Sequence, residues 1–157
     1  MRKRLLIVED DQLTAELNRR VVARLGFEVC GVAASAAEAV RLAHAEHPDL
    51  VLMDIGLAGP RDGIQVACEI RRVLGIPSLF LTGETGIEVR IRAAQAFPLG
   101  FLIKPLLEAD LRDCLERSGL DPAPGRTVTP LGNPGGRAWT QLPSLLETQA
   151  TPHPATA

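Results

Sequence analysis

Short apolar runs alternate five times with longer amphipathic stretches over residues 4–119. The first run, LLIVE, is apolar at successive positions and ends in an acid. A continuous run of this kind is typical of a strand that is buried on both faces of a sheet. When such strands are separated by helices, right-handed crossovers place the helices on both faces of a parallel sheet. The alternation therefore restricts the fold class to α/β.

We predict a flavodoxin-like doubly wound (βα)5 fold with a parallel sheet in the strand order 2-1-3-4-5. The predicted strands are residues 5–9, 27–33, 49–54, 78–82 and 100–104. The predicted helices, with their capping residues, are residues 12–25, 35–47, 64–74, 85–96 and 107–117.

Local patterns support two features of these helices. The first helix is predicted to bury an apolar stripe formed by Leu13, Leu17, Val21 and Leu25. Two other helices are predicted to begin with a capping box, in which a hydroxyl and a carboxylate satisfy free backbone N–H groups. The paired residues are Ser35 with Glu38 and Thr85 with Glu88.

The amino-acid composition of the 157-residue chain changes near residue 119, after which Pro, Gly, Thr and Ala dominate. We predict one globular domain over residues 1–119 and a Pro- and Gly-rich C-terminal tail over residues 120–157. The tail is expected to be flexible and to hold no effector domain. A cluster of apolar residues in the tail has the spacing of a short helix face that could dock a partner, with a disordered tail as the alternative. These residues are Trp139, Leu142, Leu145 and Leu146.

Charge and cysteine use exclude several classes of function. The formal net charge of −2 lacks the basic excess of a nucleic-acid binder, so we predict no direct DNA binding. The apolar run that begins after Arg4 stops at Glu9, too early for a signal peptide or a membrane span. We therefore expect a cytoplasmic protein without membrane contact. Cys30, Cys68 and Cys114 are predicted to be small buried thiols rather than disulfide or metal ligands.

Chemically functional side chains stand at the ends of four predicted strands. The first strand ends at Glu9 and Asp10, the third at Asp54, the fourth at Thr82 and the fifth at Lys104. The carboxyl ends of parallel strands meet at one edge, and ligands bind there where the strand order reverses. Each residue alone has an ordinary structural interpretation, such as a helix cap for the acidic pair. Their joint placement instead predicts a shared site.

Four stretches at these positions carry a resemblance to a known family. They are LLIVEDD, PDLVLMDIGLAGPRDG, IPSLFLTG and GFLIKPL, in this order along the chain. Because of these four stretches, residues 4–119 resemble the CheY-like receiver domain of bacterial response regulators in two-component systems. The resemblance covers about three quarters of the chain and implies Mg²⁺-dependent transfer of a phosphoryl group to an aspartate.

The resemblance implies a role for each residue of the site. Asp54 matches the phosphoacceptor, and Glu9 and Asp10 match the acidic pair that holds Mg²⁺ together with Asp54. The backbone carbonyl of Gly56 matches a further metal ligand, and Lys104 matches the lysine that binds the phosphate. An aspartate is chemically suited to this role because its carboxylate forms an acyl phosphate.

Two further positions match the switch of the family. Thr82 matches the hydroxyl that moves towards the phosphate, and Phe101 matches the aromatic residue that turns inward into the space so vacated. Phe101 lacks the hydroxyl of the tyrosine often found there, and Glu9 is longer than the aspartate common at its position.

We therefore predict a single-domain response regulator in a histidine–aspartate phosphorelay. It is not a dedicated enzyme, because it catalyses only its own phosphorylation from phosphohistidine and its autodephosphorylation. The expected partners are a sensor histidine kinase or a histidine phosphotransfer protein, and an unknown downstream protein. A phosphate-independent interaction module is the alternative, and acidic loops disfavour a flavin carrier. A homodimer is a further hypothesis, based on charges at Arg90, Arg92, Glu108, Asp110 and Asp113.

Overall fold

Five strands and five helices alternate along residues 2–120, the part of the chain that the computed structural model describes. The strands are β1 (Arg4–Val8), β2 (Glu28–Ala33), β3 (Leu50–Asp54), β4 (Ser78–Thr82) and β5 (Gly100–Ile103). The helices are α1 (Gln12–Arg24), α2 (Ala36–Glu46), α3 (Gly63–Leu74), α4 (Ile87–Ala94) and α5 (Glu108–Ser118). All strand pairs are parallel and the order is β2-β1-β3-β4-β5, which confirms the predicted fold class.

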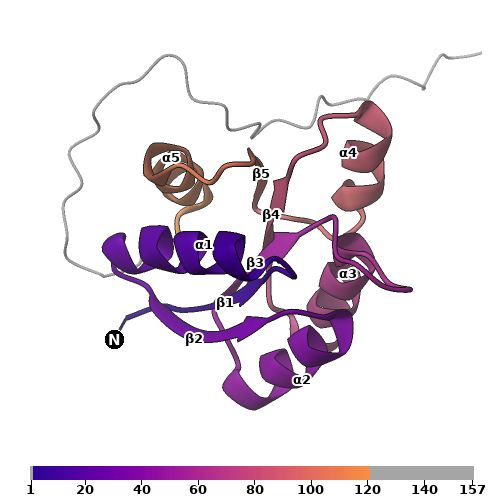
Figure 1. Ribbon diagram of the computed structural model, residues 1–157, viewed down its shortest axis with the longest axis horizontal. Helices are drawn as coiled ribbons and strands as arrows, with labels where there is room; N and C mark the ends of the chain where they lie inside the picture. Colours follow the sequence, from indigo (N-terminus) through magenta and orange to yellow (C-terminus); the bar gives the residue numbers. More distant parts are fainter. Residues whose placement is uncertain (1, 121–157) are drawn as a thin grey trace, which may run out of the picture.

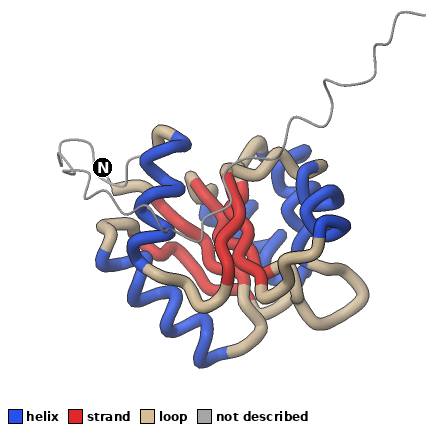
Figure 2. Tube along the Cα trace, turned by 90° about the horizontal axis from the view of Figure 1, so that it is seen from above, coloured by secondary structure: helices blue, strands red, loops and turns tan. Residues whose placement is uncertain are grey.

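The helices form two layers around the sheet (Figures 1 and 2), with α1 and α5 on one face and α2, α3 and α4 on the other. Alternate strand residues point to opposite faces, so each strand contributes to two cores. In β1, for example, Leu5 and Ile7 pack with α1 and α5, whereas Leu6 and Val8 pack under α2 and α3. This burial on both faces explains why the strands are continuous apolar runs.

The predicted boundaries differ from the observed ones by one or two residues at most strand and helix ends. The acid that was placed last in the first strand, Glu9, follows β1 instead. No helix within the described residues is long and apolar enough to cross a membrane. Of the predicted tail over residues 120–157, residues 121–157 with the apolar cluster lie outside the described residues.

The predicted apolar stripe of α1 is wrong in its first half. Leu13 is 70% exposed and Leu17 is 53% exposed, while Ala15, Asn18 and Val22 face the sheet. The reason is helical geometry. At 3.6 residues per turn, a strict spacing of four residues moves around the helix by about 40° per step, or about 120° from residue 13 to residue 25. Only the C-terminal end of the predicted stripe therefore reaches the core.

The predicted capping boxes form only in part. Ser35 caps α2 by accepting from the Glu38 N–H, but the Glu38 carboxylate accepts from the Ala34 N–H rather than from the N-cap residue. The predicted box at Thr85 does not form, because α4 begins after Gly86 without a side-chain cap. A complete box exists instead at α3, between Asp62 and Gln65, and its Asp-x-x-Gln spacing was visible in the sequence.

Two of the three cysteines are less buried than predicted. Cys114 is buried, which raises the pKa of its thiol to about 11. Cys30 and Cys68 are half-buried at the edges of the core under α2 and α3. All three are free thiols.

Gly63 fixes the start of α3 against the end of β3. A Cβ atom on Gly63 would lie 1.9 Å from the backbone oxygen of Asp54, far inside van der Waals contact. The Gly63 N–H also donates to the Ile55 carbonyl over 3.0 Å. The atoms nearest to such a Cβ belong to the backbone of Asp54 and Ile55, so no change of side-chain rotamer relieves the clash. The close approach thus requires glycine and ties α3 to the strand that carries Asp54.

We expect Gly63→Ala to lower the free energy of unfolding by about 2–3 kcal/mol, because the methyl group forces the backbone of β3 and α3 apart. Urea denaturation of the full chain measures this. Gly83→Ala is the control, since a Cβ there meets nothing within 4 Å, and it should change stability by less than about 0.5 kcal/mol. Equal effects of the two variants would contradict the packing argument.

Candidate functional site

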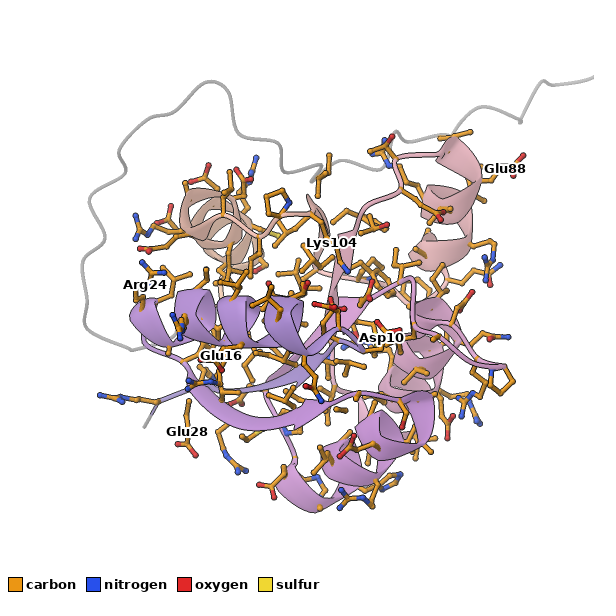
Figure 3. All side chains as sticks on the ribbon, viewed as in Figure 1. Asp10, Glu16, Arg24, Glu28, Glu88 and Lys104 are labelled. Atoms are coloured by element: carbon orange, nitrogen blue, oxygen red, sulfur yellow. The ribbon has the colours of Figure 1, made fainter. Side chains whose placement is uncertain are left out.

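The chemically functional residues predicted from the sequence meet at the carboxyl edge of the sheet. Glu9 and Asp10 follow β1, Asp54 ends β3, Thr82 ends β4 and Lys104 follows β5. The central strands β1, β3 and β4 are adjacent, so the loops that follow them share one crevice. Figure 3 shows Asp10 and Lys104 on this edge, between α1 and the loops that lead to α3 and α4.

Three carboxylates are crowded in this crevice. One oxygen each from Glu9, Asp10 and Asp54 lie within 4.8 Å of one another. Glu9 is 2% exposed and Asp54 is 4% exposed, whereas Asp10 is half-buried. Like charges at about 4 Å repel by roughly 1–4 kcal/mol, depending on the effective dielectric. The cluster therefore needs compensating positive charge.

Lys104 supplies part of that compensation. Its ammonium lies 2.9 Å from Oε2 of Glu9 and 3.2 Å from Oδ2 of Asp54. Burial alone would lower the pKa of Lys104, but the hydrogen bond to Glu9 and the charges of Asp54 and Glu9 outweigh burial and raise it. Burial raises the pKa of the Glu9 carboxyl, and its hydrogen bonds to Lys104 and Asp11 oppose the rise. The ammonium is thus held charged between two carboxylates.

Backbone N–H groups orient the three carboxylates. The Ala58 N–H donates to Oδ2 of Asp10 over 3.0 Å, and the Gly56 N–H donates to Oδ1 of Asp54 over 3.0 Å. Glu9 accepts from the Asp11 N–H through Oε1. The loop after β3 therefore fixes both Asp54 and, across the crevice, Asp10. The contact from Ala58 was not predicted, because no local sequence signal links residues 48 positions apart.

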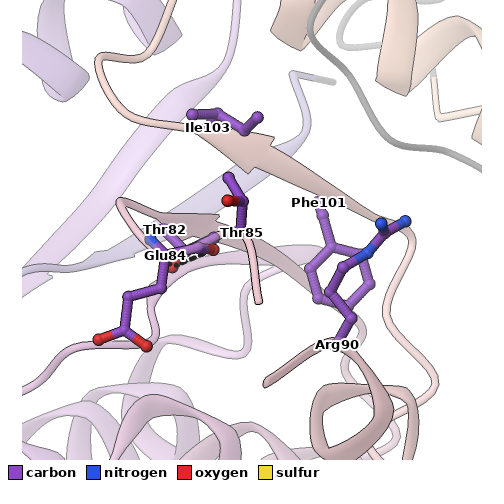
Figure 4. A pocket seen from close by; sticks show the side chains of 6 residues that line it. All are labelled: Thr82, Glu84, Thr85, Arg90, Phe101 and Ile103. Atoms are coloured by element: carbon purple, nitrogen blue, oxygen red, sulfur yellow. Dashed lines mark hydrogen bonds between the residues drawn. The ribbon is translucent and has the colours of Figure 1, made fainter. Parts of the chain in front are cut away.

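Thr82 and Phe101 occupy the neighbouring part of the edge. The Thr82 hydroxyl donates to the Glu84 carbonyl over 3.2 Å and accepts from the Glu84 N–H over 2.9 Å. Phe101 is 5% exposed and its ring stacks on Phe80. A small hollow beside the two residues is lined by Thr82, Glu84, Thr85, Arg90, Phe101 and Ile103 (Figure 4). Phe80 was absent from the predicted site, since nothing in an apolar strand sets one phenylalanine apart.

The donor set of the crevice fits a hard divalent cation. Mg²⁺ prefers oxygen ligands at about 2.0–2.1 Å, and it is usually held by one or two carboxylates together with phosphate oxygens and waters. Asp10 and Asp54 present carboxylate oxygens of this kind close to Glu9. The site thus combines three carboxylates that could hold a metal ion with an adjacent ammonium, a combination suited to phosphoryl chemistry.

Comparison with known protein families agrees with the fold and the site. The family of response regulator receiver domains matches residues 5–116, and the chain belongs to this family. Receiver domains are components of two-component signalling, so the class predicted from the sequence is confirmed. The individual roles of the site residues stay predictions.

The chain is similar to longer bacterial regulators. It is 35% identical over 114 residues to the transcriptional regulatory protein PdtaR of Mycobacterium tuberculosis, covering 73% of this chain and 55% of that protein. It is 35% identical over 116 residues to the positive alginate biosynthesis regulatory protein of Pseudomonas aeruginosa, covering 72% of this chain and 46% of that protein. The chain thus spans about half the length of these relatives.

Solved structures of receiver domains superpose on the fold. The signal receiver domain of a modulated diguanylate cyclase from Desulfovibrio desulfuricans matches with a TM-score of 0.70 at 35% identity, over 75% of this chain and 94% of that chain. A CheY-like receiver domain protein from Methanospirillum hungatei matches with a TM-score of 0.69 at 26% identity, over 77% of this chain and 95% of that chain.

Removing one of the crowded charges is expected to stabilise the metal-free protein. Lys104 pairs with Glu9 and Asp54 rather than with Asp10, so Asp10→Asn relieves repulsion and keeps an oxygen for the Ala58 N–H. We expect it to raise the free energy of unfolding by about 1 kcal/mol and the melting temperature by a few degrees.

Millimolar Mg²⁺ should raise the melting temperature of the wild type but not of Asp10→Asn, since a ligand stabilises only the state that binds it. Thermal unfolding followed by circular dichroism, with and without Mg²⁺, measures both effects. Asp113→Asn on α5 should respond to Mg²⁺ like the wild type. A lower melting temperature for metal-free Asp10→Asn would show that the Asp10 carboxylate gains more from its hydrogen bond than it loses by repulsion from Glu9 and Asp54.

Proposed function

We propose that Asp54 accepts a phosphoryl group from a phosphohistidine, so that the chain acts as a response regulator in a histidine–aspartate phosphorelay. One observation carries the proposal: Asp54 is almost fully buried, yet its carboxylate lies 3.2 Å from the ammonium of Lys104. A buried carboxylate beside a fixed cation can attack phosphorus while its surroundings neutralise the charge that gathers on the phosphoryl oxygens.

In the transfer step, one carboxylate oxygen of Asp54 forms a bond to phosphorus as the bond from phosphorus to the histidine nitrogen breaks. The leaving nitrogen keeps the electron pair of that bond. Lys104 is proposed to contact one phosphoryl oxygen, and the Thr82 hydroxyl to leave Glu84 and donate to another. Both residues lie on the same edge of the sheet as Asp54, and Lys104 already contacts its carboxylate.

A bound Mg²⁺ would supply Lewis-acid stabilisation of the phosphoryl oxygens. Glu9, Asp10 and Asp54 are proposed to hold it, together with the backbone carbonyl of Gly56. The support is the donor set, since three carboxylate oxygens lie within 4.8 Å and the Gly56 N–H already fixes the Asp54 side chain.

Regulation of transcription is the activity named for the relative PdtaR, and it is not assigned to this chain. For this chain we propose that residues 1–119 fold as one domain, that the output is a contact with another protein, and that DNA is not bound directly. The charges suggested for a homodimer are partly used within one chain, where Arg92 pairs with Asp62 and Glu108 with Arg112. Asp110 is buried. A dimer stays a prediction.

Incubation of the full chain with Mg²⁺ and acetyl phosphate should add about 80 Da to the wild type, the mass of one phosphoryl group. Intact-mass spectrometry measures the adduct. Asp54→Asn should gain nothing, because its amide cannot form the acyl phosphate, and Asp49→Asn is the control that keeps the adduct. An adduct on Asp54→Asn would assign the phosphate to another residue.

The exposed leucines of α1 suggest where the phosphodonor protein binds. Leu13 and Leu17 are apolar and exposed in the first two turns of a helix that begins two residues after Asp10. Exposed apolar side chains next to a reaction site are typical of a protein contact surface. We propose that they contact the helix that presents the phosphohistidine.

With purified histidine kinases that phosphorylate the wild type, Leu17→Ser should slow transfer about tenfold, because an apolar anchor of the complex is lost. Phosphorylation by acetyl phosphate should be unchanged. The control is Val73→Ser, an equally exposed residue of α3 on the other face of the sheet. A similar loss with both phosphodonors would place the defect in the site rather than in docking.

A further inference from the structure

The loop between β3 and α3, residues 55–62, carries two of the N–H groups that orient the acidic cluster. The Gly56 N–H holds Oδ1 of Asp54, and the Ala58 N–H holds Oδ2 of Asp10. Figure 1 shows this loop projecting from the edge of the sheet before the chain turns back into α3. The orientation of Asp10 therefore depends on the path of a loop that lies 48 residues further along the chain.

The first half of the loop is anchored by the sheet and by the core. The Ile55 N–H donates to the Leu81 carbonyl over 3.2 Å, and the Leu57 side chain is buried in the core under α2 and α3. Residues 58–60 are exposed, so this packing does not continue into the turn that follows Leu57. The next anchor is at the far end of the loop.

Asp62 fixes that far end through three contacts. Its Oδ1 accepts from the Gln65 N–H and its own N–H donates to Oε1 of Gln65, each over 3.0 Å, which makes the complete capping box of α3. Its Oδ2 pairs with the guanidinium of Arg92 on α4. Burial raises the pKa of the Asp62 carboxyl, but the hydrogen bonds from Gln65 and Arg92 outweigh burial and hold that pKa below its usual value. Asp62 is thus a charged anchor between the loop and two helices.

The contacts to the two helices differ in strength. The Asp62–Arg92 pair lies at the surface, with side chains 29% and 54% exposed, and such pairs contribute little stability. The capping box satisfies free backbone N–H groups at the start of α3. That start is itself held against the backbone of Asp54 by the close approach of Gly63. The cap therefore joins the end of the loop to a helix whose position relative to β3 is fixed.

We propose that Asp62 is a positioning residue of the metal site: by capping α3 it holds the end of the loop, so that the Ala58 N–H orients the Asp10 carboxylate. The proposal rests on the proposed function, because it deepens the account of the same Mg²⁺ site. Outer-shell partners of metal ligands contribute roughly 10–100-fold to metal affinity. Asp62 acts one step further out, so we expect a contribution of about fivefold.

Exchange of backbone amide protons with water, measured by NMR on the full chain without Mg²⁺, tests the positioning directly. Asp62→Ala should speed exchange of the Ala58 amide by about fivefold, because its hydrogen bond to Asp10 opens more often. The Gly56 amide should change by less than about twofold, because its half of the loop is anchored separately. Unchanged exchange at Ala58, or equal acceleration at both amides, would overturn the proposal.

Mg²⁺ affinity, measured by NMR titration of amide signals, gives a second readout. Asp62→Ala should bind Mg²⁺ about fivefold more weakly than the wild type. Asp62→Asn should stay within about twofold of the wild type, because asparagine caps helices as well as aspartate does, and it also controls for the lost charge. Arg92→Gln should likewise stay within about twofold, because it removes only the surface pair. A loss in either variant equal to that in Asp62→Ala would overturn the capping argument.

Two further variants separate positioning from overall stability. Val22→Ala weakens the core on the opposite face of the sheet, and it should leave Ala58 exchange and Mg²⁺ affinity within about twofold of the wild type. Gln65→Ala removes one of the two reciprocal hydrogen bonds and keeps Asp62, so it remains informative if Asp62→Ala does not fold. It should speed Ala58 exchange by about twofold or more. Wild-type exchange in Gln65→Ala would count against the proposal.

Failure of the proposed function looks different from failure of this inference. If the crevice held no Mg²⁺, titration would shift the amide signals of Asp10, Asp54 and Gly56 in neither the wild type nor any variant. The exchange of the Ala58 amide without Mg²⁺ would still decide whether Asp62 positions the loop.

Discussion

The structure depends on a concentration of negative charge at one edge of an otherwise apolar sheet. Glu9, Asp10 and Asp54 share this edge, and Lys104 bridges two of them. Charged groups with so little access to water are costly unless they are paired and hydrogen-bonded. The lysine therefore stabilises the carboxylate cluster. Under the proposed function, the same contacts would place this positive charge beside a phosphoryl group on Asp54.

This arrangement requires a rigid support. Asp54 ends the central strand β3, and all five residues of that strand are buried. Gly63 brings the start of α3 against the backbone of Asp54, and N–H groups of the intervening loop fix the Asp54 and Asp10 carboxylates. The close approach at Gly63 joins backbone to backbone, and the two loop N–H groups hold the carboxylates through their side-chain oxygens. Preorganisation of this kind suits a reaction in which positioning and electrostatic stabilisation contribute most.

The sequence predicted those features that depend on local pattern. The fold class and strand order followed from the alternation of LLIVE-like runs with helices, and the site followed from the acids, hydroxyl and lysine at the strand ends. The exposed Leu13 and Leu17 were placed in the core, because a four-residue spacing resembles a stripe until the helix is set on the sheet. The Ala58 contact and the Phe80–Phe101 stack join distant parts of the chain. Such pairs depend on tertiary packing, which no single segment encodes.

The edge of the sheet that carries Asp54 contrasts with α4, which packs only weakly against the rest of the domain. This helix is eight residues long, it has no side-chain cap, and Ala93 is its buried residue. Helices this short are marginal without packing. Ile87 and Ile91 are exposed on it, and Arg92 pairs with Asp62 at the start of α3. A surface ion pair such as Arg92–Asp62 contributes little stability. A change in the hydrogen bonds between Thr82 and Glu84 is therefore comparable to it in free energy. The strands β4 and β5 with the stacked rings of Phe80 and Phe101 thus form the well-packed part of this edge, and the segment from Thr82 to α4 forms the weakly packed part.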